Sequence, residues 1–249
     1  MISIRKITKS YTPATTDQSV LDGVDLEIQK GEFVTIFGPN GCGKSTLLDI
    51  VGGLEQPTAG DVQIAGESAS SAKIGMVFQH YNESLFPWRT ALQNVAFPLE
   101  LKGASTEEST KTAAALLEKV GLAPHTHKYP SQLSGGMKQL VAICRAIAHE
   151  PDVLLLDEPF SALDYSTTRK MELALLDMWM EKKITTLFVS HDVDEAIFLA
   201  DRVVVLSQRP ARVKKIVPID LPRPRTLDMF TSEEFGILRK KVLDAFTYE

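Results

Sequence analysis

The chain has 249 residues, of which 44% are apolar and 24% are charged, and its formal net charge is −5. This length allows one large domain or a core with a subdomain, and the composition is that of an ordinary globular protein. The negative charge argues against broad nucleic-acid binding, so we expect no nucleic-acid partner. No apolar run approaches the ~18 residues of a membrane span, and residues 1–5 lack the layout of a signal peptide. Two cysteines, Cys42 and Cys144, offer no disulfide framework and fit a reducing compartment.

The N-terminal part predicts strands that lead into a glycine loop. Apolar residues are spaced along residues 2–7 and alternate from Val24 to Ile28, which favours strands. The apolar run from Phe33 to Phe37 is consistent with a buried strand. A glycine loop follows this run, and residues 45–51 then have a helical pattern.

The glycine loop predicts phosphate binding. Residues 38–45 match Gly-x4-Gly-Lys-Ser, which arises by chance in a chain of this length about once in a hundred. The alternative is a glycine-rich turn before a helix, but strand, loop and helix are the context that a phosphate loop requires. Gly41 and Gly43 let the backbone approach phosphate oxygens, Lys44 would reach the β- and γ-phosphates, and Ser45 would bind Mg²⁺. The predicted ATP-binding residues here are Gly38, Pro39, Asn40, Gly41, Cys42, Gly43, Lys44, Ser45 and Thr46.

The middle of the chain is mostly helical in pattern. Thr90 with Gln93, and Ser105 with Glu108, have the spacing of capping boxes, and Gly121 predicts the end of a helix. A second glycine-bearing helix start occurs at Leu133–Gln139. Ser134 and the amides of Gly135 and Gly136 would form an anion site there, although an ordinary N-cap explains the same residues.

A buried strand at residues 153–156 ends in two carboxylates. Ligands of open α/β sheets bind at this end of the strands, so Asp157 would hold Mg²⁺ and Glu158 would orient and deprotonate the attacking water. Solvated acids after a strand are the alternative. A helix over about 167–180 and a strand over 185–190 complete a strand–helix–strand alternation, which predicts a largely parallel sheet.

The C-terminal part has a different composition. Residues 209–225 are locally basic and contain four prolines. Phe235, Leu238, Val242 and Phe246 then fall on one face of a short helix that we expect to pack on the core.

Together these motifs resemble the ATP-binding subunits of ABC transporters, over nearly the whole chain. The resemblance implies a P-loop NTPase fold in the α/β class, with a mostly parallel sheet, antiparallel β elements at the N-terminus and an inserted helical subdomain. It places the catalytic core at 1–80 and 151–206, the helical subdomain at 81–150 and a C-terminal extension at 207–249. It also implies ATP and Mg²⁺ as ligands, and a second ATPase subunit, identical or closely related, whose Leu133–Gln139 segment binds the γ-phosphate.

Further site roles follow from the resemblance alone. Gln79 would sense Mg²⁺ and water, His191 would contact the γ-phosphate, and Tyr11 would stack on adenine, with a core tyrosine as the alternative for the last. Asp164, at the end of residues 161–164, would lie in a loop that crosses the dimer interface, with a helix-capping turn as the alternative. The signature residues implied to bind nucleotide are Ser134, Gly135, Gly136 and Gln139.

Departures from the family pattern are few. Leu140 stands where arginine is frequent, and Cys144 stands where a small residue is usual, and neither is expected to contact phosphate. Cys42 lies at a helix N-terminus, which is expected to lower its thiol pKa, so we expect an alkylating reagent to block ATP hydrolysis.

Two segments point to a branch of the family. Ser84–Trp88 lies where such subunits meet a helix of the membrane partner, and an exposed Phe86-Pro87-Trp88 would form an apolar contact patch. The tail over 208–225 resembles the nitrate, sulfonate and taurine importers. This implies separate permease subunits, an indirectly linked solute-binding protein, and a position on the cytoplasmic face of the cell membrane. A soluble ABC ATPase, an exporter subunit and a regulatory module that binds ATP without cleaving it are the alternatives.

Overall fold

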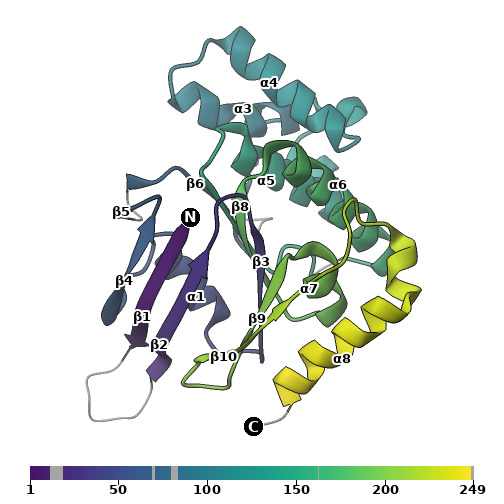
Figure 1. Cartoon of the computed structure of the whole chain (residues 1–249). Coiled ribbons are helices and arrows are strands. Elements are labelled where there is room, and N and C mark those ends of the chain that lie inside the picture. Colours follow the sequence, from purple (N-terminus) through teal and green to yellow (C-terminus); the bar gives the residue numbers. More distant parts are fainter. Residues whose placement is uncertain (12–18, 69–70, 80–83, 162, 248–249) are drawn as a thin grey trace. The chain divides into compact units, whose positions relative to one another are not determined.

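The computed structural model describes residues 1–11, 19–68, 71–79, 84–161 and 163–247. The chain divides into two compact units (Figure 1). The first unit contains Met1–Ala72 and Lys183–Glu249, and the second contains Lys73–Lys182. The helical subdomain predicted at 81–150 lies within the second unit.

An antiparallel sheet forms the N-terminal part of the first unit, in the strand order β2-β1-β4-β5. Burial alternates from Val24 to Ile28 in β2, as the sequence pattern predicts, whereas Ile2, Ser3 and Ile4 of β1 are all buried. The strands are β1 (Ile2–Ser10), β2 (Ser19–Ile28), β4 (Ala59–Ile64) and β5 (Glu67–Ser68).

The remaining strands of the first unit follow the order β10-β9-β3-β8. β3 is parallel to both β8 and β9, and β10 runs antiparallel to β9. Every residue of β3 and β8 is buried, which explains their continuous apolar character. The strands are β3 (Phe33–Phe37), β8 (Thr185–Ser190), β9 (Arg202–Leu206) and β10 (Val213–Pro218).

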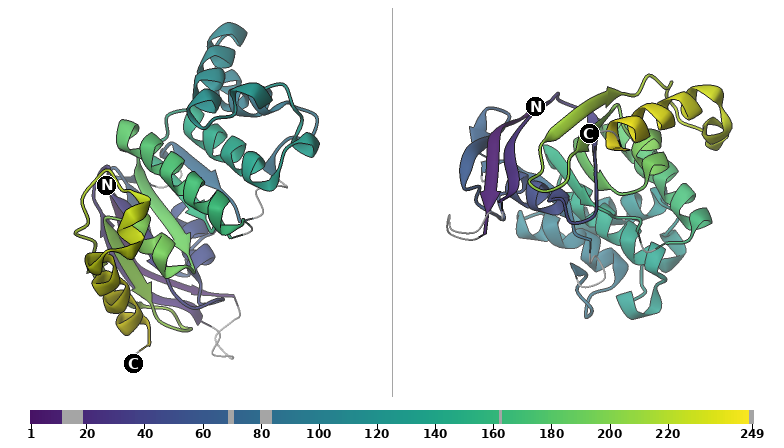
Figure 2. Two further views of the ribbon diagram at one scale, coloured as in Figure 1. Left: turned by 90° about the vertical axis from the view of Figure 1, so that its right-hand side faces the viewer. Right: turned by 90° about the horizontal axis from the view of Figure 1, so that it is seen from below.

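Helices of the first unit include the one that follows the glycine loop and the one that ends the chain. They are α1 (Lys44–Val51), α7 (Val193–Leu199), the 3-10 helix η4 (Leu227–Thr231) and α8 (Glu233–Thr247). Both views in Figure 2 show α8 alongside β9 and β10. Phe235, Leu238 and Val242 are buried, as the sequence predicts for this helix. Phe246 lies at its end, with its ring 5.2 Å from the ring of Phe37.

The basic C-terminal segment is anchored rather than free in solvent. Residues 213–218 pair with β9 as β10, a strand that the sequence pattern did not predict. Arg223 forms an ion pair with Asp201 at 2.8 Å, and Arg225 donates to the carbonyl of Ala200 at 2.9 Å. Burial lowers the pKa of Arg225 to about 10. The carbonyls of Leu199 and Ala200 end α7, so the two arginines complement the negative end of that helix.

The second unit joins two parallel strands, β6 (Ile74–Val77) and β7 (Val153–Asp157), to a group of helices. Both predicted capping boxes are present, at Thr90 and at Ser105. Helix α3 packs against its two neighbours α4 and α5. The elements are α3 (Ala91–Leu101), α4 (Thr106–Lys119), η2 (Ala123–His125), η3 (Pro130–Gln132), α5 (Gly135–Ala148) and α6 (Tyr165–Lys182).

Over the described part of the chain, no helix is both long enough and apolar enough to cross a membrane.

Candidate ATP site

The phosphate loop is shaped by two glycines with positive φ angles. Gly41 has a φ of +73° and Gly43 a φ of +123°, and side-chain-bearing residues rarely adopt such angles. A Cβ atom at Gly43 would lie 2.8 Å from Val20 Cγ1 and 2.9 Å from Leu21 Cδ2. Gly43 is therefore required both by its backbone angle and by its close approach to β2.

Helix α1 begins directly after this loop. Within the described residues no side chain caps α1, and its first turn contains no acidic residue. Lys44 is buried, and its Nζ donates to the carbonyl oxygens of Gly38 at 3.0 Å and Pro39 at 3.1 Å. The loop thus combines backbone N–H groups, a helix N-terminus and an ammonium group, which are the donors that polyphosphate binds.

Cys42 does not have the reactive character that the sequence suggested. Its side chain is buried, and this desolvation raises the pKa of the thiol above its usual value. The nearby Lys44 charge and backbone hydrogen bonds act in the opposite direction but are weaker. The predicted lowering of the pKa is therefore wrong, because burial outweighs the position at the helix N-terminus.

His191 and the phosphate loop lie at the same edge of the sheet in the first unit. Phe37, the last residue of β3, pairs with Ser190, the last residue of β8. The chain continues from these residues into the loop and into His191, which is exposed. The carboxyl ends of adjacent parallel strands meet at one edge, so the structure places the predicted γ-phosphate contact beside the predicted phosphate cradle.

Tyr11 lies at the end of β1, and 58% of its surface is exposed. The core tyrosine considered as an alternative is thus wrong. Its hydroxyl donates to Glu55 Oε2 at 3.3 Å, and Lys9 Nζ lies 4.9 Å from the centre of its ring. An exposed ring held in this way is suited to stacking on a nucleobase.

In the second unit, Gln79 and the two carboxylates share a strand edge. Val77 of β6 pairs with Leu156 of β7. Strand β6 ends at Val77, and β7 ends one residue after Leu156. Gln79 is exposed and Asp157 is buried, whereas Glu158 is partly exposed. Glu158 has a φ of +43°, an uncommon angle for a residue with a side chain and one that is often found at functional sites.

The signature segment begins α5 and has a different construction from the phosphate loop. The Ser134 side chain caps the helix by accepting from the Met137 N–H at 3.3 Å. Gly135 is exposed, but Gly136 is buried, and a Cβ there would lie 2.9 Å from Thr167 Cγ2 on α6. The N-cap interpretation therefore describes Ser134, while the helix start still presents N–H groups at an exposed surface.

Gln139 and Asp164 differ in burial. Gln139 is fully buried, and in the described structure neither polar atom of its amide has a hydrogen-bond partner. Its burial on the inward face of α5 argues against direct nucleotide contact. Asp164 is exposed and accepts from Thr167 Oγ1 at 2.6 Å, so it caps α6, and this hydrogen bond lowers the pKa of its carboxyl. Ala162 of the same loop lies outside the described residues.

An aromatic cluster occurs at the segment predicted to meet a membrane partner. Trp88 is 71% exposed, and Phe86 lies between it and Phe97, with ring separations of 5.5 and 4.8 Å. The buried Asn94 holds this loop by accepting from the Phe86 N–H and donating to three backbone carbonyls. Sequence reasoning missed Asn94, because nothing separates a buried asparagine from an exposed one in a helical pattern.

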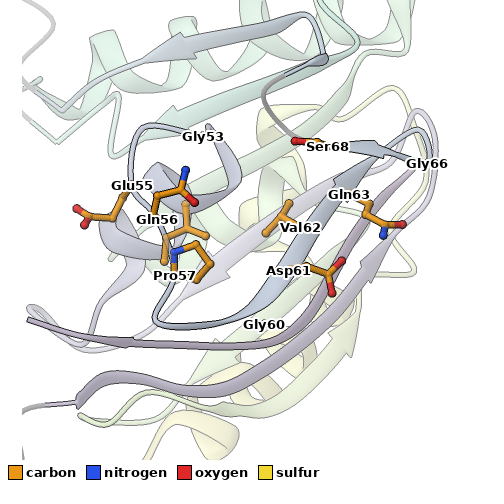
Figure 3. A pocket seen from close by; sticks show the side chains of 11 residues that line it. Gly53, Glu55, Gln56, Pro57, Gly60, Asp61, Val62, Gln63, Gly66 and Ser68 are labelled. Carbon is orange, nitrogen blue, oxygen red and sulfur yellow. The ribbon is translucent and has the colours of Figure 1, made fainter. Parts of the chain in front are cut away.

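A separate pocket of ≈ 350 Å³ lies between the C-terminal end of α1 and β4. Figure 3 shows its polar lining, which includes Glu55, Gln56, Asp61 and Gln63. Its lining residues all come from residues 50–68, so this pocket is distinct from the phosphate loop.

The residues present fit MgATP. The loop of the first unit supplies anion donors, and the described residues contain no cluster of three or more His, Cys, Asp or Glu side chains that could hold a metal by themselves. Mg²⁺ bound to nucleotide usually takes only one or two protein ligands, together with phosphate oxygens and water.

Comparison with known proteins identifies the family. Residues 21–161 match the family model described as ABC transporter. The chain belongs to the ABC transporter family. It is 46% identical, over 98% of its length and 90% of the relative's, to an uncharacterized ABC transporter ATP-binding protein of Methanocaldococcus jannaschii. It is 43% identical to the aliphatic sulfonates import ATP-binding protein of Bacillus cereus, over 99% of this chain and 96% of the relative.

Solved ABC cassettes have the same fold. A dimeric, post-hydrolysis ATP-binding cassette bound to ADP and Pi matches 89% of this chain and 100% of its own, with a TM-score of 0.78 and 35% identity. The family and this likeness show that the chain is an ABC ATPase that binds and hydrolyses ATP.

Proposed function

We propose that this ABC ATPase powers the import of a small anionic solute, such as an aliphatic sulfonate, through separate membrane subunits. The observation that carries the proposal is the 43% identity, over nearly the full length, to an aliphatic sulfonates import protein. The resemblance of the C-terminal segment to this branch of importers does not distinguish a sulfonate from nitrate, taurine or bicarbonate. The ATPase would lie on the cytoplasmic face of the membrane, bound to permease subunits and linked only indirectly to a solute-binding protein.

The aromatic cluster around Trp88 supports a membrane partner. An exposed tryptophan that is backed by Phe86 and held by the buried Asn94 is an ordered apolar surface, and such side chains dominate protein interfaces. We assign this patch to a permease helix. Trp88→Ala is expected to weaken association with the permease without changing nucleotide binding.

The proposed mechanism assigns a task to each half of the site. Lys44 and the amides of residues 41–46 would bind the phosphates, Ser45 and Asp157 would hold Mg²⁺, and Glu158 would orient and deprotonate the attacking water. Bound Mg²⁺ would offset the charge that develops on the phosphates. His191 would contact the γ-phosphate.

A second copy of the chain, or a close relative, would complete each site. Ser134 and Gly135 are exposed at the start of α5, and we assign the N–H groups of this helix start to the γ-phosphate bound by the partner chain. Dimeric cassettes among the solved relatives support this arrangement. Closing with ATP and opening after hydrolysis would then drive the membrane subunits.

The catalytic assignment is tested with Glu158→Gln, using Glu118→Gln on the exposed face of α4 as the matched control. Loss of a general base lowers turnover roughly 10²- to 10⁴-fold. We expect this loss with ATP binding retained, and an ATP-stabilised dimer in sedimentation. Turnover close to wild type in Glu158→Gln would remove Glu158 from this role.

The solute assignment is tested in cells. Deletion of the gene is expected to abolish growth on an alkanesulfonate as the only sulfur source, and wild-type chain but not Glu158→Gln should restore it. Normal growth of the deletion strain on several alkanesulfonates would contradict the solute class, while leaving ATP hydrolysis untouched.

A further inference from the structure

Lys9, near the end of β1, makes three contacts with groups around Tyr11. Its Nζ lies 2.5 Å from Glu55 Oε1 and 2.7 Å from the carbonyl oxygen of Gln56, to which it donates. The same Nζ lies over the Tyr11 ring, 4.9 Å from its centre. The Lys9 side chain is only 11% exposed, whereas the Glu55 side chain is 33% exposed, so the cluster lies at the surface.

Glu55 links the lysine back to the tyrosine. One carboxylate oxygen pairs with Lys9, and the other accepts from the Tyr11 hydroxyl at 3.3 Å. The hydrogen bond from Lys9 lowers the pKa of this carboxyl, so Glu55 is ionised at neutral pH. In Figure 3 the Glu55 side chain points away from Asp61, the other acid of the neighbouring pocket.

The three side chains therefore form a closed triangle, in which Lys9 contacts both Glu55 and Tyr11. Each contact alone is weak at a surface. Together they hold the ring of Tyr11 by its hydroxyl end and by one face. Tyr11 as a whole residue is 58% exposed, and we expect the uncovered face of its ring to be available for stacking.

The triangle is also linked to the phosphate loop through β2. Lys9 pairs with Leu21 in the sheet. The Leu21 and Val20 side chains lie against Gly43, where an added Cβ would meet them at 2.9 and 2.8 Å. Lys9 and the turn that begins α1 are thus both neighbours of Leu21 on β2.

We propose that Lys9, acting with Glu55, is a positioning residue that orients Tyr11 for nucleobase stacking. The inference rests on the proposed role of Tyr11 in binding adenine. Lys9 itself contacts no nucleotide; it acts by ordering the ring. Lys9 then contributes to recognition of the nucleoside part of ATP and contributes nothing to recognition of the polyphosphate.

The size of the effect follows from the cost of ordering a side chain on binding. A rotamer-rich side chain that must be immobilised costs about 0.5–1.5 kcal/mol, which corresponds to roughly two- to ten-fold in affinity. Lys9→Met keeps the aliphatic stem and removes the charge. We expect it to weaken MgATP binding by roughly three- to ten-fold. Lys9→Arg keeps the cation and is expected to bind within two-fold of wild type.

The experiment measures two dissociation constants by calorimetry, for MgATP and for magnesium tripolyphosphate, which lacks the nucleoside. The variants are Lys9→Met, Lys9→Arg and Glu55→Gln, each alone and with Tyr11→Ala. Lys30→Met, at an exposed turn of the same unit, is the matched control. Thermal unfolding of each variant separates loss of fold from loss of positioning.

The expected result is weaker MgATP binding in Lys9→Met and Glu55→Gln, unchanged tripolyphosphate binding, and no further loss when Tyr11→Ala is already present. Equal weakening of both ligands, or a full additional loss in the Tyr11→Ala background, would overturn the positioning role. If Tyr11→Ala weakens MgATP binding but Lys9→Met leaves it unchanged, only the inference about Lys9 is overturned. If Tyr11→Ala leaves MgATP affinity unchanged, the stacking role of Tyr11 is overturned. Failure of the wild-type chain to bind MgATP would refute the proposed function.

Discussion

The two glycine-bearing helix starts of this protein are built in opposite ways. At α1, Gly41 and Gly43 have positive φ angles, no described side chain caps the helix, and a buried lysine donates into the loop. At α5, the glycines lie within the helix, and Ser134 provides a side-chain cap. The first start is a concave loop whose backbone shape depends on glycine. The second is a regular helix end that presents N–H groups to whatever faces it.

Similar motifs can therefore require glycine for different physical reasons. In the phosphate loop both glycines have positive φ angles, which L-residues rarely adopt, and at Gly43 the close approach of Val20 and Leu21 adds a second demand. In the signature segment the demand at Gly136 comes from packing, because α6 approaches this position closely. Substitutions at the two sites should therefore fail for different reasons and by different amounts.

The largest effect is expected from Gly43→Ala. The φ of +123° would cost about 1–3 kcal/mol for a residue with a Cβ, and the overlap with Val20 and Leu21 adds a similar amount. Calorimetry should show nucleotide affinity reduced by more than roughly 100-fold. Gly41→Ala is the matched control, since it has a φ of +73° and open space around the added Cβ, and should cost only about 1 kcal/mol. Equal losses in the two variants would contradict this account of the loop.

A smaller effect, in the same direction, is expected from Gly136→Ala in α5. Alanine gains up to about 1 kcal/mol in a helix, but the Cβ would lie 2.9 Å from Thr167 Cγ2, and overpacking costs about 1–3 kcal/mol. Chemical denaturation should show a net loss of about 1 kcal/mol. Gly135→Ala, on the exposed side of the same turn, should be neutral or slightly stabilising. A higher free energy of unfolding in Gly136→Ala than in wild type would contradict this, because α6 would then accommodate the added methyl group at little cost.

The smallest effect concerns Cys42, where little or no reaction is expected. Because burial raises the pKa of its thiol, iodoacetamide at pH 8 should label Cys42 in the folded protein at least roughly ten-fold more slowly than a free cysteine. Labelling should accelerate as the pH rises further or when the protein is unfolded, as mass spectrometry can follow. Rapid labelling of the folded protein at neutral pH would contradict the raised pKa and show that the Cys42 thiol is reactive, as its position at a helix N-terminus suggested.

Local features were predicted well from the sequence. The capping boxes at Thr90 and Ser105, the buried strand at 153–156 and the helix start at Ser134 depend on residues a few positions apart, so their signals are complete within a short window. The resemblance to a known family also predicted the fold and ATP hydrolysis, and the comparisons confirm both.

Features that depend on distant contacts were not predicted. β10 forms because β9 pairs with it, although its own residues resemble a basic linker. The Cys42 pKa depends on how deeply the side chain is buried, which the helix-terminus argument does not include. The burial of Gln139 likewise follows from packing against another helix, because it lies three residues after Gly136, on the face of α5 that α6 approaches.

We propose that each ATP site is completed by the signature segment of another chain. The most direct measurement is turnover per chain as a function of protein concentration, for wild type and for Ser134→Arg, with the monomer fraction followed by sedimentation. The account predicts that turnover per chain falls towards zero as the protein is diluted to monomer, and that Ser134→Arg is inactive at every concentration. Full turnover in a strictly monomeric preparation, unaffected by Ser134→Arg, would contradict it.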